Sequence, residues 1–182
     1  NYTKSGIWYI YLPIQDKGTK IQIVPMKGNP VVYVRLTSRL IDNKGTYGEI
    51  IKTVNREDRI DIVTKEKMRK YYMLNGTNLQ QFEIQGPAKV RAFSRLKFDN
   101  KSMTDDYYMF IREDGIDLGT YYFQTEKSSE SSVLESKDPV GKWRSLWLNI
   151  PDGRHYYTFS LPNMEANKDK TIFIRLKEWK EK

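Results

Sequence analysis

The sequence predicts an all-β protein, an antiparallel β-sandwich or jelly roll built from internal strand-turn-strand repeats. Short segments of alternating apolar and polar residues recur along the chain, and turn residues separate them about every eight to fifteen positions. No amphipathic helix of about ten or more residues is evident. Aromatic residues make up 13% of the chain and include 13 Tyr, a composition that suits strands better than helices.

An internal repeat organises the predicted strands. Three stretches share the order of an aromatic-rich strand, a turn, an alternating strand, a second turn and a strand that carries Arg after a β-branched residue. They span residues 7–40, 71–96 and 146–176, and the first two share the pattern V-R-x-x-S-R-L. A repeated unit of this kind is normally a scaffold, so we expect the function in what each copy adds.

Alternation predicts the individual strands. They are expected at residues 20–23, 32–40, 81–84, 89–98, 156–161 and 172–176. Gly, Pro, Asn and Asp favour turn conformations, which predicts turns at 27–30, 86–87, 114–115 and 151–153. Residues 65–72 are the best helical candidate, but they suit a strand equally well.

Two segments have the composition of connections. Residues 55–70 are dense in charges of both signs and predict a domain boundary near residue 66. The predicted units are an N-terminal sandwich-like unit, 1–66, and a larger one, 67–182, which could also merge into one continuous all-β body. Residues 124–139 are rich in Ser and Glu and predict a long surface loop or a solvated hairpin tip.

Composition restricts the class of protein. The chain contains no Cys, which excludes disulfides and thiolate chemistry. No apolar run approaches the roughly 20 residues of a membrane-spanning helix, so we expect no membrane span. The sequence begins at Asn1 without Met. Together with the Tyr-rich, Cys-free β composition, this leads us to expect an exported bacterial protein, periplasmic, on the cell surface or extracellular.

Positive charge recurs on one face of the repeated strands. Because successive side chains of a strand alternate between faces, basic and aromatic residues of each copy point to the same side. The predicted ligand-binding residues are Tyr33, Arg35, Arg39, Lys89, Arg91, Phe93, Arg95, Lys97 and Arg175. If the strands pair laterally, these side chains form a basic, partly aromatic face. In the ordinary structural alternative, Lys and Arg are only the solvated side of a sheet and pair with Asp or Glu across the ladder.

The partner that this face predicts is an acidic or neutral polysaccharide, a lipid headgroup or another envelope protein. Trp8, Trp143, Trp147 and Trp179 are candidates for stacking on sugar rings, although a Trp that begins a repeated strand more often belongs to a core. The net charge of +8 also suits nucleic acid. The chain has no RNP-like run, helix-turn-helix or dense basic tail, so single-stranded nucleic-acid binding is a less favoured alternative.

No catalytic residue is predicted, and we expect a noncatalytic module. His155 is the only histidine and follows a predicted turn, where we expect it in solvent. The G-x-S-x-G pattern and Gly-rich phosphate loops are absent. A carbohydrate-active enzyme with carboxylate catalysis remains an alternative because acidic residues cluster around one predicted strand. These are Asp105, Asp106, Glu113, Asp114 and Asp117.

The same acidic residues leave a structural calcium open. Asp105, Asp106, Asp114 and Asp117 offer oxygen ligands from neighbouring turns, although their spacing is not that of an EF-hand. One His and no Cys disfavour zinc. No metal or cofactor is therefore assigned from the sequence.

Overall fold

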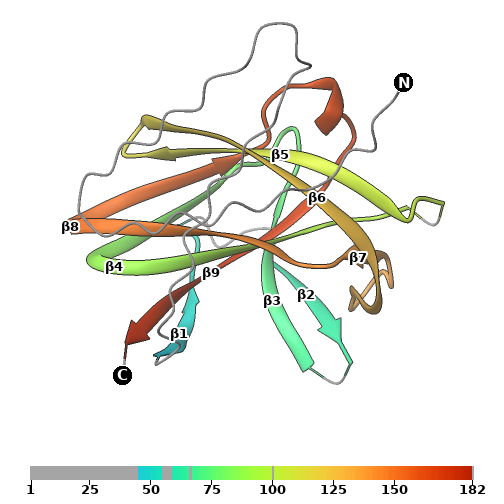
Figure 1. Ribbon diagram of the computed structural model, residues 1–182, viewed down its shortest axis with the longest axis horizontal. Coiled ribbons are helices and arrows are strands. Elements are labelled where there is room, and N and C mark those ends of the chain that lie inside the picture. The colour runs from blue at the N-terminus through green and yellow to red at the C-terminus, as the bar shows by residue number, and fades with distance from the viewer. Residues whose placement is uncertain (1–44, 55–58, 66, 100, 182) are drawn as a thin grey trace, which may run out of the picture. The chain divides into compact units, whose positions relative to one another are not determined.

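The computed structural model describes residues 45–54, 59–65, 67–99 and 101–181 (Figure 1). Contacts within the chain divide it into Asn1–Ile41 and Asp42–Lys182, and every described element belongs to the second unit. The strands are β1 (Gly45–Ile51), β2 (Arg59–Thr64), β3 (Lys67–Leu74), β4 (Gln80–Leu96), β5 (Thr104–Glu113), β6 (Ile116–Val133), β7 (Pro139–Gly141), β8 (Arg144–Ser160) and β9 (Ile172–Glu181). A short 3₁₀ helix, η1 (Glu165–Asn167), lies between β8 and β9.

The described strands form one antiparallel sheet that closes on itself. Their order is β1-β9-β3-β2-β6-β5-β8-β4, and a further pairing of β4 with β9 closes a ring of seven strands. Strand β1 lies outside the ring against β9, and β7 pairs with β6. The all-β antiparallel prediction is confirmed. The pairing describes a closed barrel with two added strands, which differs from the predicted two-sheet sandwich or jelly roll.

Two predicted turns lie inside long strands. Strand β4 continues through Gly86–Pro87, and β8 continues through residues 151–153. The two strands pair along almost their whole length, with a register shift between Gly86 and Ala88. Gly and Pro here mark a β-bulge, which re-aims a strand without ending it. In the repeat copies at 71–96 and 146–176, a predicted turn thus lies within a continuous strand. The repeat itself stays a prediction.

The predicted surface loop at 124–139 is mostly strand. Residues up to Val133 belong to β6, and β7 begins at Pro139. Thr125, Ser131 and Val133 point inward and are buried, while the Ser- and Glu-rich positions between them are more exposed. Small hydroxyl side chains satisfy their hydrogen bonds inside the sheet, as Ser131 Oγ does with Thr64 Oγ1 at 2.9 Å.

The charged segment around residue 66 joins a hairpin. Strands β2 and β3 pair over their full length, from Arg59 with Tyr72 to Thr64 with Lys67. The helical candidate at 65–72 is thus largely strand. Lys65 adopts a positive φ of 54° at the turn. Most of the predicted unit 1–66 lies outside the described residues, so the predicted domain boundary near residue 66 stays a prediction.

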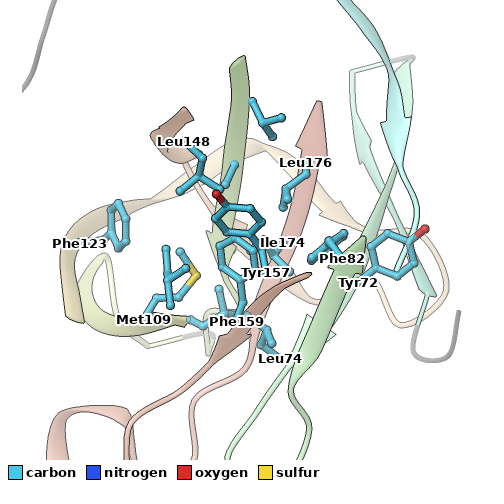
Figure 2. Close-up of a cluster of buried hydrophobic side chains, with 14 of the residues drawn as sticks. Tyr72, Leu74, Phe82, Met109, Phe123, Leu148, Tyr157, Phe159, Ile174 and Leu176 are labelled. Carbon is cyan, nitrogen blue, oxygen red and sulfur yellow. The ribbon is translucent and has the colours of Figure 1, made fainter. Parts of the chain in front are cut away.

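Apolar side chains of alternating positions fill the interior. Figure 2 shows the larger cluster, in which Tyr157 and Phe159 lie among side chains from β3, β4, β5, β6, β8 and β9, and Phe82 lies beside Tyr72. A second, smaller cluster gathers where β2, β3, β6, β7 and β9 meet. It consists of Ile62, Tyr71, Val133, Val140 and Phe173.

Strands β3 and β9 contribute to both clusters. In β3, Tyr72 and Leu74 enter the larger cluster while Tyr71 enters the smaller one. Burial on both faces at Tyr71–Tyr72 and at Ile172–Ile174 fixes the positions of these two strands in the sheet. Within the described residues, no helix has the length and apolarity needed to cross a bilayer.

Candidate ligand-binding face

Four strands bring cations and aromatic rings together on one face of the sheet. Strand β4 pairs with β8 on one side and with β9 on the other, and β9 also pairs with β1. In this register Arg91 lies opposite both Trp147 and Lys177, and Phe93 lies opposite Arg175. We call the resulting surface the basic aromatic face. It consists of Tyr47, Lys89, Arg91, Phe93, Trp143, Trp147, Arg175, Lys177 and Trp179.

The rings of this face pack on one another and form a continuous array. Tyr47 lies at its centre, with its ring centroid 4.9 Å from Trp179, 5.6 Å from Phe93 and 6.5 Å from Trp147. Trp147 and Trp179 meet edge to face at 6.0 Å. Edge-to-face and offset contacts of this kind hold rings in defined positions. The array is therefore preorganised rather than a set of mobile surface side chains.

Arg91 lies within this array. The Cζ atom of its guanidinium lies 5.0 Å from the ring centroid of Phe93 and 5.2 Å from those of Trp143 and Trp147. Its Nε donates to Ser145 Oγ at 2.9 Å, and its Nη1 donates to Tyr47 Oη at 2.5 Å. Cation–π contacts and two hydrogen bonds fix the plane of the guanidinium, which is the condition for directed recognition of an oxyanion.

Three further cations border the rings. Lys89 Nζ lies 5.4 Å from the Trp147 ring centroid, Arg175 Cζ lies 5.5 Å from that of Phe93, and Lys177 Nζ lies 5.9 Å from that of Tyr47. Among the described residues, no carboxylate lies within 4.0 Å of these side chains or of Arg91. Cross-strand ion pairing, the ordinary reason for cations on a sheet, is therefore not their role in this part of the chain.

Burial without a counterion among the described residues lowers the pKa of two of these cations, Arg175 and Lys177. Burial, together with the charges of Arg69 and Arg95, lowers the pKa of Arg175, although the Tyr71 side chain partly offsets this effect. Burial also lowers the pKa of Lys177, and the neighbouring charges of Arg175 and Arg69 add to the effect. Both shifts mean that the folded protein disfavours these positive charges, so a bound anion would stabilise them.

The structure brings four of the predicted binding residues together. Lys89, Arg91, Phe93 and Arg175 all belong to the basic aromatic face. Tyr33, Arg35 and Arg39 lie outside the described residues.

Two predicted residues are placed elsewhere. Arg95 is only 3% exposed, and its Nη1 donates to the Gly141 carbonyl at 2.8 Å. The sequence predicted Arg95 on the outer face with Arg91. Instead, β7 covers its side chain, which is part of the buried interior. Lys97 is exposed and forms an ion pair with Asp138 at 2.7 Å.

Five residues of the face were absent from the predicted binding set. Trp143 and Trp147 were considered only as stacking candidates, as was Trp179. Lys177 and Tyr47 were not assigned to the site, and Tyr47 belongs to β1, which the sequence analysis did not predict as a strand. Residues 47–51 read Tyr-Gly-Glu-Ile-Ile without a clean alternation, and the register shift between Tyr47 and Ile50 interrupts the period of two by which a strand is recognised.

The acidic residues considered for calcium or catalysis separate into three sites. Asp105 Oδ1 binds Lys170 at 2.7 Å, and Asp106 also contacts that lysine. Asp117 pairs with Arg112 at 2.8 Å. Asp114 pairs with His155. The convergence of Asp105, Asp106, Asp114 and Asp117 that a calcium site would require does not occur. Asp105 and Asp106 lie at the start of β5, and Asp114 and Asp117 lie beyond its other end.

His155 joins the hairpin to β8. Its Nδ1 lies 2.7 Å from Asp114 Oδ2 and 3.4 Å from Glu113 Oε1, and its side chain is 17% exposed. The side chain is half-buried and does not lie free in solvent as predicted, because Asp114, Glu113 and the Asp152 carbonyl surround its ring. The hydrogen bond to Asp114 and the one to the Asp152 carbonyl are the chief causes that raise the pKa of His155. The Glu113, Asp114 and His155 donor atoms lie within 4.8 Å of one another.

Comparison with known proteins gives distant structural similarities. No protein-family model matches the chain, and no curated protein matches it. A carbohydrate-binding module CBM36 in complex with calcium and xylotriose aligns with a TM-score of 0.35 and 8% identity over 59% of this chain and 77% of that chain. The CBM36-1 domain of a multidomain xylanase from the hindgut metagenome of Trinervitermes trinervoides gives a TM-score of 0.36 and 10% identity over 76% and 91% of the two chains.

A third similarity is to an exo-β-1,3-galactanase from Phanerochaete chrysosporium with galactose. The TM-score is 0.38 and the identity 13%, over 72% of this chain and 29% of that chain. At these values the similarities define neither a family nor a site. The class of the protein rests on its own structure: an all-β antiparallel barrel that presents a basic aromatic face on β1, β4, β8 and β9.

Proposed function

We propose that this protein is a noncatalytic binding module that holds an acidic glycan on the basic aromatic face. The observation that carries the proposal is the position of Arg91, fixed among Phe93, Trp143 and Trp147 with no carboxylate of the described residues beside it. In keeping with the composition, we place this module in the envelope or the extracellular space of a bacterium.

The face offers the two interactions that an acidic glycan requires. Sugar rings present C–H faces that pack on aromatic side chains, and Trp143 is 45% exposed at the border of the array. Carboxylate, sulfate and phosphate substituents accept hydrogen bonds from Arg and Lys, with Arg able to bind in bidentate geometry. Rings and cations alternate across neighbouring strands, so one sugar unit can meet both.

The proposal treats the module as noncatalytic because the carboxylates considered for hydrolysis already have partners. Asp105 and Asp106 bind Lys170, Asp114 binds His155, Asp117 binds Arg112, and Glu113 accepts a hydrogen bond from Tyr157 Oη. The hydrogen bond from the Tyr156 backbone N–H and then that with His155 lower the pKa of Asp114, whereas glycoside hydrolysis requires one carboxylic acid that is protonated. Release of reducing ends from any bound glycan would overturn this part of the proposal.

The test is a binding titration by calorimetry against four polymers: a polyuronate, a sulfated polysaccharide, a neutral xylan and single-stranded DNA. Each is measured at about 50 and 500 mM salt, because binding to a polyanion by charge alone weakens steeply with salt. Arg91→Ala and Trp147→Ala are the test variants. Arg112→Ala is the matched control, since Arg112 Cζ also lies over a ring, that of Phe110 at 5.0 Å, but on β5.

We expect binding to an acidic glycan that survives high salt. Loss of either test side chain should weaken it roughly tenfold or more, which corresponds to about 1.4 kcal/mol. The control variant should bind like the unaltered protein. Equal, salt-sensitive binding to DNA and to every acidic polymer would replace the proposal by nonspecific polyanion binding. No binding to any of the polymers would leave a protein-assembly role as the better account.

A further inference from the structure

Arg175 is the most deeply placed cation of the basic aromatic face. Its guanidinium carbon lies 5.5 Å from the ring centroids of both Tyr71 and Phe93, so the side chain lies beside rings from β3 and β4. Its Nε is excluded from solvent and has no hydrogen-bond partner among the residues that the structure describes. Buried donors in native proteins nearly always have an acceptor, so an arginine left in this state needs an explanation.

Two more cations lie on the same side of the sheet. Lys177 follows Arg175 by two residues in β9, and Arg69 precedes Tyr71 by two residues in β3, which places each on the side of its neighbour. Arg69 is half-buried. Its charge acts on Arg175 and on Lys177 and lowers the pKa of both, after the larger effect of burial.

This cationic cluster has no counterion in the described part of the chain, where none of Arg69, Arg175 and Lys177 forms an ion pair within 4.0 Å. Like charges that are partly removed from water repel one another strongly, and the repulsion is relieved when an anion binds between them. The solvent-excluded Nε of Arg175 and the lowered pKa values of Arg175 and Lys177 distinguish the cluster from Lys89.

The arrangement of the donors favours one type of anion. The cations approach from β3 and from β9, and Arg91 of β4 lies opposite Lys177. A planar carboxylate has two oxygens and matches a single coplanar donor pair. A tetrahedral oxyanion has three terminal oxygens that point in different directions, and it can accept from donors on several strands at once.

We infer that Arg69, Arg175 and Lys177 form a subsite for a tetrahedral oxyanion, a sulfate or phosphate ester borne by the glycan. This inference rests on the proposed function, because the cluster continues the same face, and it adds that the face selects esterified glycans over polyuronates. Sulfate and phosphate esters share this chemistry, so the experiment includes both.

The first measurement uses the free ions and needs no glycan. Thermal unfolding is followed in sulfate, phosphate, acetate and chloride at equal ionic strength. We expect the unfolding temperature to be higher in sulfate or phosphate than in acetate, because an anion that binds only the folded state stabilises it. Arg175→Gln and Arg69→Gln should remove this difference, while Arg112→Gln should keep it. An equal response of the unaltered protein to acetate and to the tetrahedral ions would overturn the inference.

The second measurement compares an O-sulfated polysaccharide, its de-O-sulfated form and a phosphorylated glycan of the same backbone. Arg175→Gln should lower affinity for an esterified glycan roughly tenfold, to the level of the unesterified form, which it should leave unchanged. Trp147→Ala should weaken all three. The esterified glycan that binds with the higher affinity shows whether the subsite prefers a sulfate or a phosphate ester.

The two proposals fail in different ways. A response to the free tetrahedral ions without binding of any glycan would remove the proposed function and keep the anion subsite. Equal binding of all three glycans, with no difference among the ions, would remove the subsite and keep the face. If circular dichroism shows that Arg175→Gln does not fold, Arg69→Gln and Arg175→Lys replace it in the test. Arg175→Lys retains the positive charge and should keep part of the response to the tetrahedral ions.

Discussion

Arg91 and Arg95 lie on the same strand, four residues apart and on the same side of β4, yet their surroundings are opposite. Arg91 is stacked among the rings of Trp143 and Trp147. Arg95 is 3% exposed and donates to the Gly141 carbonyl. The strand β7 covers one end of the face and leaves the other end open, so two similar side chains serve different purposes.

This difference predicts that Arg95 contributes to the stability of the fold, whereas Arg91 contributes to glycan binding. Arg95→Met should lower the free energy of unfolding by roughly 2–4 kcal/mol, because it leaves a buried carbonyl without its charged donor. Arg91→Met should change stability by less than about 1 kcal/mol and should remove most glycan binding. Urea unfolding and calorimetric titration of both variants measure the two effects. A glycan-binding defect in a fully stable Arg95→Met protein would contradict this assignment.

The ion pair between His155 and Asp114 predicts a pH dependence of stability. The folded state raises the pKa of His155 above its usual value of 6.5, so the stabilisation is complete below that value and is lost as pH rises through the folded-state pKa. The folded state also lowers the pKa of Asp114 below 3.8, chiefly through the hydrogen bond from the Tyr156 backbone N–H and then through His155. That contribution is present above 3.8 and is lost as pH falls through the folded-state pKa.

We therefore expect the unfolding temperature to decline as pH rises from 6.5 through the higher folded-state pKa of His155. Asp114→Asn should flatten this part of the profile because the histidine then loses its anionic partner. Glu126→Gln, which removes the ion pair of Glu126 with Lys142 elsewhere on the surface, is the matched control and should leave the slope unchanged. An equal slope in the unaltered protein and in Asp114→Asn would show that another group titrates.

The close approach of β4 and β8 at the bulge predicts that replacing Gly86 by Ala destabilises the protein far more than the same replacement at Gly76. A Cβ atom at Gly86 would lie 1.6 Å from the Pro151 carbonyl oxygen, so Gly86→Ala must displace backbone and should destabilise by about 3 kcal/mol. At Gly76 no atom lies within 4 Å of the added Cβ, and Gly76→Ala should change stability by less than about 1 kcal/mol. Chemical unfolding of the two variants checks the prediction, and equal stabilities would refute the close approach of the strands.

Asn167 links η1 to the edge of β5. Its Oδ1 accepts from the Tyr108 N–H at 2.9 Å, and its Nδ2 donates to the Tyr108 carbonyl at 3.0 Å. The buried amide replaces a neighbouring strand at this position. Asn167→Ala should cost roughly 1–3 kcal/mol, and hydrogen exchange at the Tyr108 amide should become faster. Unchanged exchange at Tyr108 would contradict the role that we assign to this side chain.

The sequence predicted strands well wherever alternation was clear. The pattern of Val90, Ala92 and Leu96 against Arg91 and Phe93 correctly indicated a half-buried strand with a basic outer side. What alternation lacks is information on pairing. It could not show that β4 lies between β8 and β9, which is why the binding residues from β1 and β8 were incomplete.

The turn predicted at 114–115 is confirmed, whereas those at 86–87 and 151–153 were wrong for a local reason. Gly86, Pro87 and Gly153 carry strong turn signals, but the same residue types also occur at bulges, and only the partner strand decides between the two. Likewise, Arg95 and Arg91 have equivalent positions in the alternation. The burial of Arg95 depends on β7, a strand of three residues with no alternation to read.

Strand β9 borders β4 along one edge, while its other edge is divided between β3 at residues 172–174 and β1 from Leu176 onward. Detachment of β1 would leave unpaired backbone groups on β9, a template for intermolecular pairing, and would also withdraw the Tyr47 hydroxyl from Arg91. A ligand that needs Tyr47 in place thus favours the state in which this edge is closed. The occupied protein should therefore aggregate more slowly than the empty one.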